Sequence, residues 1–512
     1  MLVNTFTAAL VSVDAHTVTV EVNATEGTTF SIVGLPDASV RESYDRIHTA
    51  AQNSGFRLHG KRMVVNLSPA DLKKEGTAYD LPIAVGMIAA CGQLQSAHLA
   101  RYMMVGELSL DGHLRPVKGV LPIAIKARAE GFEGLLVPHA NAREAAVVNR
   151  LKVYAADTLS EVVDFLEGRI SLSPIEVDTR AEFGRQQGEV LYDFSDVKGQ
   201  ENVKRALEVA AAGGHNILMV GAPGSGKSMM AKRVAGILPP FTLSEALETT
   251  KVYSVAGKLP PHTTLLSHRP FRAPHHSVSV PALVGGGVNP RPGEISLAHN
   301  GVLFLDELAE FNRNVLELMR QPMEERTITV ARAKATVDYP ASFMLVAAMN
   351  PCPCGYYNHP TRTCSCASGA VQKYLAKVSG PLMDRIDIQV EIAPVAFEEI
   401  SDATPAESSL RIRERVLKAR ERQTERFKAF PHIHCNAQMP PKLTALYARP
   451  DEEGLKRLKQ AMERLGLSAR AYDRILKVAR TIADLANSEA VTAEHIAEAI
   501  LYRGLDRASW GL

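Results

Sequence analysis

Two different spacings of hydrophobic residues divide the chain into regions. Residues 17–22 alternate between polar and apolar side chains, as half-buried strands do, and residues 40–53 carry apolar positions at helical spacing. Residues 81–91 are almost continuously apolar and predict a buried helix. Residues 105–138 have the pattern of strand, Asp-Gly hairpin, strand, helix and strand. This mixture predicts a folded α/β domain over residues 1–170.

The remaining chain has a different organisation. Residues 171–189 show little periodicity and are expected to form a linker. Short apolar runs alternate with helical patterns over residues 190–395, which predicts a second α/β domain. Residues 396–512 are mostly helical by their 3.6-residue spacing and are expected to form a helical lid. The fold class is therefore predicted to be α/β.

Composition narrows the class of protein further. The 512 residues are 46% hydrophobic and 22% charged, as in ordinary globular proteins, and a net charge of +2 does not by itself indicate a polyanion partner. No apolar run reaches the roughly 20 residues that span a bilayer, and no secretory signal is visible. Four of the six cysteines fall within residues 352–366, which suits a metal site in a reducing cytosol better than disulfides. We therefore expect a cytoplasmic protein that does not bind membranes.

A glycine-rich loop lies between an apolar strand at residues 217–220 and a helix. This is the phosphate-binding loop pattern, in which backbone N–H groups and a helix N-terminus surround phosphates. Lys227 is expected to reach the β- and γ-phosphates of ATP, and the Ser228 hydroxyl to ligate Mg²⁺. A purely structural glycine turn is the alternative, which the complete motif disfavours. The expected ATP-binding loop consists of Gly221, Ala222, Pro223, Gly224, Ser225, Gly226, Lys227 and Ser228.

Two further apolar runs end in candidate catalytic groups. Residues 302–305 are followed by Asp306 and Glu307, and residues 343–349 are followed by Asn350. In P-loop ATPases one carboxylate after such a strand holds the magnesium water shell and another orients the attacking water, which predicts these roles for Asp306 and Glu307. Asn350 is suited to contact the γ-phosphate or the water. A solvated strand end is the alternative for the two carboxylates, and the phosphate-binding loop favours catalysis.

Together these motifs resemble the AAA+ ATPases. Residues 192–207 are similar to the segment that AAA+ proteins wrap around adenine, which implies that Val197 and Gly199 lie near the base. In the magnesium-chelatase and MCM-like branch, the position of Arg385 matches the finger that reaches the γ-phosphate of a neighbouring subunit. Arg470, at the start of an expected lid helix, resembles the sensor-2 arginine. A structural ion pair is the alternative for each arginine, whereas a finger at Arg385 requires a ring of subunits.

Residues 325–340 predict a cationic β-hairpin between the Asp306 and Asn350 strands. The hairpin resembles the pre-sensor-1 hairpin of MCM helicases, whose basic tip lies in the central channel of a ring. The resemblance implies that Arg332 and Lys334 contact DNA phosphates, which provide grip without reading sequence. The alternative is a solvated edge hairpin with incidental charge.

An insertion at residues 269–287 is a second candidate contact for DNA. Related ATPases carry an extra loop into the channel at this place. Phe271 and Arg272 are suited to stack on bases and to pair with the phosphate backbone. Metal binding by the adjacent His275 and His276 is a weaker alternative.

Four cysteines follow Asn350 in two close pairs, and four thiolates match the ligand count of tetrahedral zinc. A metal here would brace the loop that follows the Asn350 strand. The single residue between the members of each pair is fewer than usual, so reduced structural thiols and a redox pair stay open as alternatives. The cysteines are Cys352, Cys354, Cys364 and Cys366.

Over much of residues 1–170 the chain resembles the protease domain of Lon and the related domain of bacterial RadA. Residues 76–81 stand where Lon has its catalytic serine, and residues 120–121 stand where Lon has its lysine. Thr77 and Lys118 lie nearby but out of register. We therefore expect a platform for assembly or for the DNA path, and no proteolysis.

A Lon-like domain ahead of such an ATPase module, with the stretches "PFRAPHH" and "NPCPCG", resembles the ComM/YifB family over nearly the whole chain. The resemblance implies a hexameric, ATP-driven DNA helicase that promotes branch migration on single-stranded, forked or branched DNA during natural transformation. The main rival is a magnesium-chelatase-like ATPase that remodels a protein partner. An ATP-dependent protease or unfoldase is a third class, but the sequence shows neither an aromatic-hydrophobic pore loop nor an intact dyad.

Overall fold

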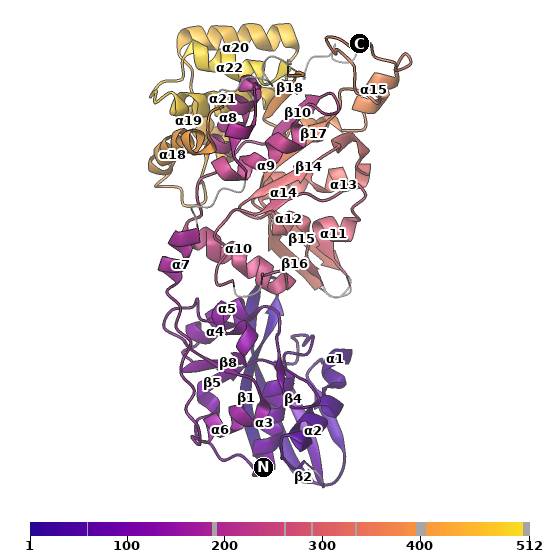
Figure 1. Ribbon diagram of the computed structural model, residues 1–512, viewed down its shortest axis with the longest axis vertical. Coiled ribbons are helices and arrows are strands. Elements are labelled where there is room, and N and C mark those ends of the chain that lie inside the picture. Colours follow the sequence, from indigo (N-terminus) through magenta and orange to yellow (C-terminus); the bar gives the residue numbers. More distant parts are fainter. Residues whose placement is uncertain are drawn as a thin grey trace. The chain divides into compact units, whose positions relative to one another are not determined.

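The chain folds into two compact units (Figure 1), which are described separately. Unit 1 comprises Met1–Gln187 together with Thr242–Ser267, and unit 2 comprises Gly188–Phe241 together with His268–Leu512. Within the part of the chain that is described, no helix has the length and hydropathy needed to cross a bilayer. The computed structural model describes residues 1–58, 60–186, 192–260, 263–287, 290–332, 335–395 and 406–504.

Unit 1 is built on a seven-stranded mixed sheet in the order β3-β4-β2-β1-β5-β8-β9. β1 pairs antiparallel with β2 and parallel with β5, and β8 and β9 continue the parallel half. The strands are β1 (Leu2–Val11), β2 (Asp14–Glu26), β3 (Phe30–Val33), β4 (Lys61–Ser68), β5 (Tyr102–Met104), β8 (Gly134–Pro138) and β9 (Lys152–Ala156), with a separate hairpin of β6 (Glu107–Leu108) and β7 (Leu114–Arg115).

The apolar run of the first region forms a central helix, as its pattern predicts. All 11 residues of α3 are buried, and a Cβ at Gly86 would lie 2.7 Å from a methyl group of Val22, so only glycine permits this close approach to β2. The other helices of this part of unit 1 are α1 (Ala38–Arg41), α2 (Ser43–Asn53), α3 (Asp80–Ala90), α4 (Val120–Ala129), α5 (Ala142–Ala145) and α6 (Leu159–Leu166).

The expected linker contains a helix. α7 (Thr179–Gln186) begins eight residues after the linker was expected to start at residue 171. Ile175, Val177 and Phe183 pack against the buried cluster beside α4 and β8. These apolar side chains are too widely spaced to give a clear period, so the sequence pattern did not predict that this segment packs on unit 1.

Unit 1 also contains a segment from the middle of the ATPase sequence. α10 (Leu243–Ala256) lies within the expected second domain, yet Leu247 and Leu265 join the buried cluster beside α4. The Ser254 hydroxyl donates to Glu144 at 2.5 Å, and the Ser254 carbonyl accepts from the Gly119 N–H at 3.1 Å. Residues 242–267 are therefore structurally part of the N-terminal unit.

Unit 2 contains a five-stranded sheet in the order β11-β14-β17-β10-β18, with every neighbouring pair parallel. The strands β10, β14 and β17 are buried along their whole length, as their apolar sequences predict for strands covered on both faces. The strands are β10 (Ile217–Gly221), β11 (Phe271–Arg272), β14 (Val302–Leu305), β17 (Met344–Met349) and β18 (Ile388–Ile392).

Smaller elements of unit 2 surround this sheet. The helices are α8 (Glu201–Gly213), α9 (Lys227–Ile237), α11 (Val280–Val284), α12 (Glu294–Leu297), α13 (Arg313–Leu318), α14 (Arg320–Glu325), α15 (Ala370–Leu375) and α16 (Gly380–Met383). Two hairpins are β12 (Gly285–Gly286) with β13 (Arg291–Pro292), and β15 (Thr327–Arg332) with β16 (Ala335–Pro340).

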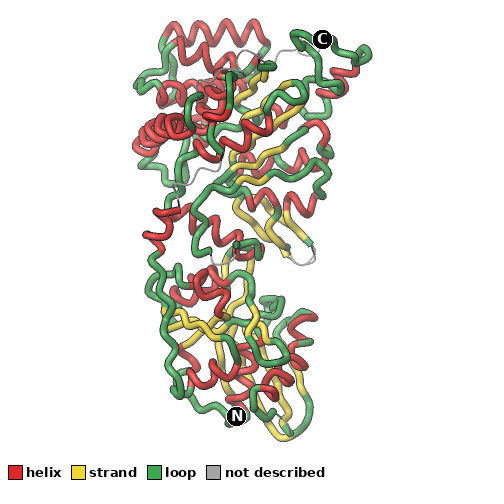
Figure 2. Tube along the Cα trace, in the orientation of Figure 1, coloured by secondary structure: helices red, strands yellow, loops and turns green. Residues whose placement is uncertain are grey.

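The C-terminal part of unit 2 is helical, as predicted, and Figure 2 shows its helices in red beside the yellow strands of the sheet. α18 and α21 both pack against α8, which joins the helices to the α/β core through one buried cluster. The helices are α18 (Ser409–Arg426), α19 (Pro441–Tyr447), α20 (Glu452–Leu465), α21 (Ala469–Leu485) and α22 (Ala493–Leu501).

Candidate nucleotide site

The phosphate-binding loop occupies the carboxyl edge of the unit 2 sheet. β10 ends at Gly221, and α9 begins at Lys227, so the strand, loop and helix appear in the predicted order. Gly224 and Gly226 have φ values of +79° and +89°, which other residues adopt only with strain. Among the described residues, Ser225 Oγ is buried without a hydrogen-bond partner, and such an unmet group in a native fold needs an explanation. A phosphate in the loop would give this hydroxyl a partner.

The side chain of Lys227 is hydrogen-bonded to the phosphate-binding loop. Its Nζ donates to the carbonyl oxygens of Gly221 and Ala222 at 2.7 and 2.8 Å, and to Asn350 Oδ1 at 3.2 Å. The side chain is buried, and burial lowers the pKa of Lys227. The hydrogen-bond partners of this ammonium are neutral, and the carboxylates of Asp306 and Glu307 are near enough to interact with its charge. A phosphate would add charge-assisted hydrogen bonds to it.

The two residues expected to hold magnesium are in contact. Ser228 Oγ donates to Asp306 Oδ2 at 2.6 Å, although the residues are separated by 78 positions in the chain. β14 and β10 both lie next to β17, so their carboxyl ends open at the same edge. A hydroxyl and a carboxylate are the oxygen ligands that Mg²⁺ uses beside nucleotide phosphates, so these residues fit the ion.

Glu307 has a strained backbone and a partner that the sequence analysis missed. Its φ of +54° is uncommon for a residue with a side chain, and such outliers cluster at functional sites. Its Oε2 lies 3.1 Å from Nδ1 of His276, and both side chains are partly exposed, by 55% and 33%. β11 pairs parallel with β14, so residues a few positions after each strand meet at one edge. Recognising β11 as a strand would have predicted this contact.

The expected loop position of Phe271 and Arg272 is wrong, because these two residues form the edge strand β11. The Phe271 ring stacks on Phe304 with centroids 5.8 Å apart, and Arg272 makes two hydrogen bonds to Glu294 at 2.6 and 2.8 Å. Both side chains are thus engaged within unit 2. The sequence pattern did not predict this strand, because a strand of only two residues shows no alternation.

Arg385 lies at the opposite edge of the sheet from the phosphate-binding loop. Its carbonyl accepts from the side chain of Asn216, the residue before β10, at 3.2 Å. β10 has 5 residues, which at about 3.3 Å per residue separate the two edges by roughly 13 Å. The guanidinium pairs with Glu324 at 2.6 Å and donates to the Pro381 carbonyl at 2.7 Å. Arg385 therefore does not extend toward its own Lys227.

Arg470 lies in the first turn of α21, where a lid helix was expected to begin. Its guanidinium is 3.6 Å from Asp384, the residue before Arg385. Arg474, one turn further along α21, forms an ion pair with Asp387. Burial of Asp387 opposes its ionisation, but the nearby charge of Arg474 outweighs this effect and lowers the pKa of Asp387. The two candidate arginines thus belong to one edge of unit 2.

The segment expected near adenine approaches the end of β18. Val197 is buried in the core of unit 2, and Gly199 has a φ of +61°. The side-chain amide of Gln200 donates to the carbonyl of Ala393, the residue after β18. Val197 and Gly199 thus lie in a segment that is hydrogen-bonded to the carboxyl edge of the sheet.

The hairpin predicted between the two catalytic strands is present. β15 and β16 pair antiparallel from Thr327–Pro340 to Arg332–Ala335. Ile328, Val330, Val337 and Tyr339 are buried, so one face is anchored on unit 2. Residues 333 and 334, which include the expected DNA contact Lys334, lie outside the described residues.

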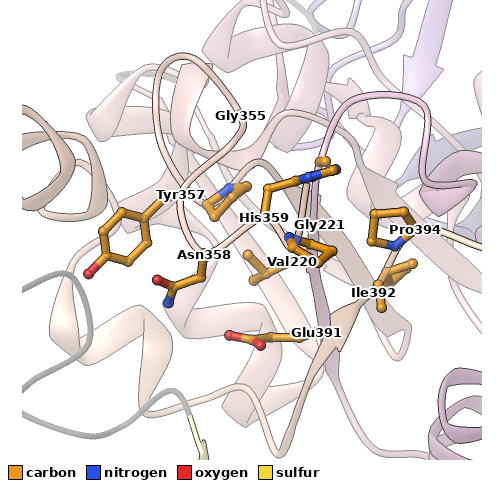
Figure 3. A pocket seen from close by; sticks show the side chains of 13 residues that line it. Val220, Gly221, Gly355, Tyr357, Asn358, His359, Glu391, Ile392 and Pro394 are labelled. Atoms are coloured by element: carbon orange, nitrogen blue, oxygen red, sulfur yellow. The ribbon is translucent and has the colours of Figure 1, made fainter. Parts of the chain in front are cut away.

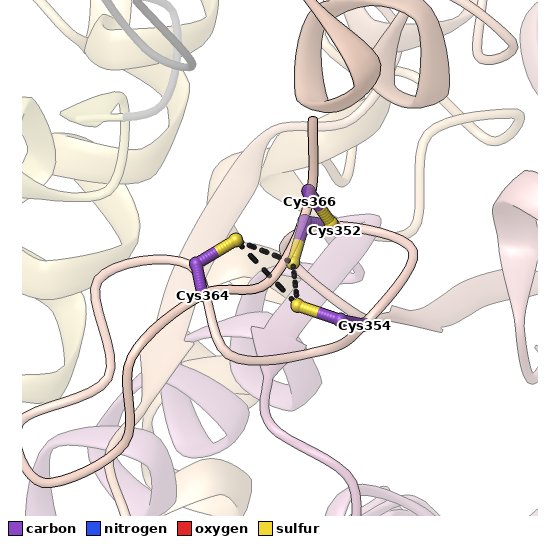
Figure 4. Close-up of side chains that lie close together, drawn as sticks. All are labelled: Cys352, Cys354, Cys364 and Cys366. Carbon is purple, nitrogen blue, oxygen red and sulfur yellow. Dashed lines mark hydrogen bonds between the residues drawn. The ribbon is translucent and has the colours of Figure 1, made fainter. Parts of the chain in front are cut away.

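The four clustered cysteines converge after β17 (Figure 4). All four Sγ atoms lie within 4.8 Å of one another, and the separations of Cys352, Cys354 and Cys364 are 3.3, 3.5 and 3.8 Å. Tetrahedral zinc with Zn–S bonds near 2.3 Å places its sulfurs about 3.8 Å apart. The backbone N–H of Tyr356 lowers the pKa of Cys354 to about 5, whereas burial raises the pKa of Cys352. The donor set therefore fits a tetrahedral metal ion.

The residues near the Lon-type catalytic positions have other partners in unit 1. Thr77 donates its hydroxyl to Glu107, and Asp80 accepts two hydrogen bonds from Arg46 at 2.9 and 3.0 Å. The aliphatic part of Lys118 lies against Gly257, where a Cβ would be 2.5 Å from Lys118 Cε. Thr77 and Lys118 thus take part in separate contacts.

Family models match three successive parts of the chain. They are described as magnesium chelatase, subunit ChlI, over residues 193–400; subunit ChlI of Mg-chelatase, over residues 20–141; and magnesium chelatase, subunit ChlI C-terminal, over residues 406–503. The matches follow the order of the expected domains, and between them they cover most of the described residues.

Relatives extend the similarity to the full length. The chain is 44% identical over 505 residues to the competence protein ComM of Haemophilus influenzae. This alignment covers 98% of this chain and 97% of that protein. It is 43% identical over 509 residues to the protein YifB of Escherichia coli, with shares of 98% and 97%. It is 28% identical over 180 residues to the magnesium-chelatase 38 kDa subunit of Rhodobacter capsulatus, covering 31% of this chain and 51% of that protein.

Proposed function

Because this chain belongs to the ComM/YifB family, we propose that it is an AAA+ ATPase that uses ATP and Mg²⁺ to move DNA. The observation that carries the proposal is the convergence of Lys227 with Asn350, and of Ser228 with Asp306, at the carboxyl edge of a parallel sheet. That edge is where open α/β sheets bind their ligands.

Hydrolysis uses the groups at this edge. Lys227 exchanges its carbonyl partners for oxygens of the β- and γ-phosphates. Ser228 and Asp306 would hold Mg²⁺, which when bound neutralises the charge that develops on the phosphates. Glu307 orients the attacking water, and Asn350 contacts the γ-phosphate or that water.

A neighbouring subunit completes the site. Arg385 and Arg470 lie at the amino edge of the sheet, separated from the loop of their own subunit by the length of β10, so they serve the nucleotide of another subunit. Arg385 exchanges Glu324 for the γ-phosphate across this interface. A closed ring gives every subunit such a neighbour, and a homohexamer is the assembly that we propose.

DNA is moved by the hairpin of β15 and β16. This hairpin is joined through short connections to β14, which precedes Asp306 and Glu307, and to β17, which precedes Asn350. A rearrangement around the nucleotide therefore displaces both ends of the hairpin. Arg332 and Lys334 at its tip contact phosphates of the DNA backbone.

The finer function that we propose is branch migration on single-stranded, forked or branched DNA. The name of the relative from Haemophilus influenzae, competence protein ComM, supports a role during natural transformation. Recombination of incoming DNA takes place in the cytoplasm, where the free thiols of this chain stay reduced.

Zinc is the metal that we propose for Cys352, Cys354, Cys364 and Cys366, because tetrahedral thiolate sites select it. The zinc would close the loop that follows Asn350 and so brace one side of the nucleotide site. In a reducing compartment this role is structural.

A second candidate function is ATP-driven remodelling of a protein partner. The 28% identity to the magnesium-chelatase 38 kDa subunit favours it, as does the match of residues 193–400 to the family model described as magnesium chelatase, subunit ChlI. The basic hairpin tip favours DNA instead.

The rate of ATP hydrolysis distinguishes the two functions. We expect single-stranded and forked DNA to raise the rate of the full-length protein several-fold, and to leave Glu307→Gln inactive at every DNA concentration. Equal rates with and without DNA in the active protein would contradict the DNA motor and favour a protein partner.

A further inference from the structure

The side-chain amide of Asn216, the residue before β10, joins β17 to the segment that carries Arg385. Its Nδ2 donates to the carbonyl oxygen of Arg385 at 3.2 Å, and its Oδ1 accepts from the backbone N–H of Leu345 in β17 at 2.9 Å. A carbonyl can only accept and an N–H can only donate, so these two partners require the amide in a single orientation. An asparagine side chain therefore satisfies both contacts at once.

The backbone of Asn216 binds the same segment. Its N–H donates to Oδ2 of Asp387 at 3.1 Å, and its carbonyl oxygen accepts from the N–H groups of Asp387 and Ile388 at 3.0 Å each. Asn216 thus contacts the chain on both sides of Ile386. The backbone of Arg385 is consequently held at the start of β10, whatever partner its guanidinium has.

Asp387 is in turn anchored by groups that include the helical part of unit 2. It pairs with Arg474 of α21, and its Oδ2 lies 3.4 Å from Nδ1 of His215. The other ring nitrogen of His215 is 2.8 Å from the hydroxyl of Thr481, which also belongs to α21. Asp387 and His215 are both buried, so these contacts replace the water that the carboxylate loses. The groups that bind Asn216 are therefore themselves well fixed.

The guanidinium of Arg385 has partners that it can exchange. It pairs with Glu324, whose side chain is 55% exposed, and donates to the carbonyl of Pro381. An exposed ion pair contributes little stability, so an anion of higher charge can displace it. Among the described residues, the buried Nε of Arg385 has no hydrogen-bond partner, which leaves one donor unused. The backbone of Arg385 is thus fixed, while its guanidinium is able to bind an incoming phosphate.

Strands β10 and β18 connect this arrangement to the opposite edge of the sheet. They pair in parallel from Ile217–Ile388 to Gly221–Ile392. At the far end, Gly221 and Ile392 line a cavity of about 270 Å³ at the start of the phosphate-binding loop (Figure 3). Asn216 and the phosphate-binding loop thus stand at the two ends of one buried strand.

We infer that Asn216 is a positioning residue for Arg385: its amide fixes the backbone of Arg385 so that the guanidinium reaches the γ-phosphate held by the neighbouring subunit. The inference rests on the proposed function, since it requires a nucleotide site shared between subunits. A misplacement of about 1 Å can cost roughly 10²-fold in rate, so an amide that fixes this arginine matters for turnover. Asn216 also joins the strand that leads to a subunit's own loop to the arginine that the subunit supplies to its neighbour.

Mixed rings of the full-length protein show whether Asn216 acts through Arg385, because the substitutions can be placed in different subunits. A Lys227→Ala subunit does not hydrolyse ATP but supplies Arg385 to an Arg385→Ala neighbour. We expect the double variant Lys227→Ala/Asn216→Ala to restore about fivefold less ATP turnover to Arg385→Ala subunits than Lys227→Ala restores. This is the effect of losing about one hydrogen bond.

Two further donor subunits sharpen the comparison. Lys227→Ala/Asn216→Asp keeps the size of the side chain and the acceptor for Leu345 but loses the donor to Arg385, so it should show the same loss. Lys227→Ala/Asn53→Ala is the matched control, because the side chain of Asn53 also donates to a backbone carbonyl, within unit 1. It should restore as much turnover as Lys227→Ala.

Equal restoration by Lys227→Ala with and without the substitutions of Asn216 would overturn the inference and leave the shared site standing. We expect the single variants Asn216→Ala and Asn216→Asp to bind ADP as the wild type does. Loss of ADP affinity in both would also overturn the inference, because Asn216 would then act on the site of its own subunit. If Lys227→Ala itself restores nothing, the shared site of the proposed function is contradicted, and the inference falls with it.

Discussion

The pair formed by His276 and Glu307 links the catalytic carboxylate to the insertion at residues 269–287. Glu307 Oε2 lies 3.1 Å from His276 Nδ1, and the backbone of Glu307 has a φ of +54°. A carboxylate that is already hydrogen-bonded is a weaker acceptor for the attacking water. The hypothesis that follows is that His276 acts as a positioning residue that restrains Glu307.

His276→Ala should raise the rate of ATP hydrolysis without DNA several-fold and leave the affinity for ATP unchanged, because Glu307 acts on water. His275→Ala is the matched control, since His275 Nδ1 contacts Ser277. Steady-state kcat and KM measure the difference. A lower kcat in His276→Ala, or the same rise in both variants, would show that the pair does not restrain Glu307.

At this scale the sequence predicted a contact between two recognised motifs and missed a contact made by a segment that no strand pattern marks. The partnership of Ser228 with Asp306 was predictable, because both belong to patterns whose geometry is set by a parallel sheet. The partnership of His276 with Glu307 was not, because it depends on a strand of two residues. The same short strand accounts for the incorrect loop position of Phe271 and Arg272.

Two segments carry the proposed metal and DNA contacts: the cysteine loop after β17 and the hairpin of β15 and β16. Both were visible in the sequence, one from its clustered thiols and one from its alternating pattern. Helices α7 and α10 show a limit of prediction from sequence patterns. Their sequences do not indicate which unit they belong to, and only tertiary packing in unit 1 shows it.

The cysteine loop should contain zinc. We expect the purified protein to carry about one zinc ion per chain, and Cys364→Ser to lose it, because Cys364 lies 3.5 and 3.8 Å from two of the other thiols. Cys435→Ser, outside the cluster, is the control. Elemental analysis of the three proteins gives the answer, and absence of zinc from the wild type would leave reduced thiols as the interpretation.

The hairpin tip should contribute one phosphate contact through Lys334. Lys334→Ala is expected to weaken DNA binding and to reduce the slope of log affinity against log salt concentration by about one unit. Lys258→Ala, which changes a lysine in unit 1, serves as the control. An unchanged slope in Lys334→Ala would remove this residue from the DNA path.

At the scale of the whole molecule, the chain crosses between its units at three places. The segment Thr242–Ser267 leaves unit 2 after α9, packs into unit 1, and returns before β11. α9 carries Lys227 and Ser228, and β11 precedes His276. The N-terminal unit is therefore joined through the chain to α9 and to β11, the two elements that lead to Lys227 and to His276.

Catalysis should require two subunits. Arg385→Ala is expected to lower ATP turnover about 10³-fold while ATP binding is retained. Lys227→Ala is also inactive, but it keeps Arg385. Mixed rings of the two variants should recover activity, because a Lys227→Ala subunit supplies the missing arginine to its neighbour. Normal turnover by Arg385→Ala, or no recovery in the mixture, would contradict a site shared between subunits.

The central claim is that hydrolysis at the edge of the sheet moves DNA. Displacement of a labelled strand from a branched DNA by the full-length protein tests it most directly, with Glu307→Gln as a matched variant that binds ATP without hydrolysing it. We predict displacement by the wild type only with hydrolysable ATP, and none by Glu307→Gln. A wild-type protein that hydrolyses ATP in the presence of the branched DNA and displaces no strand would contradict the account.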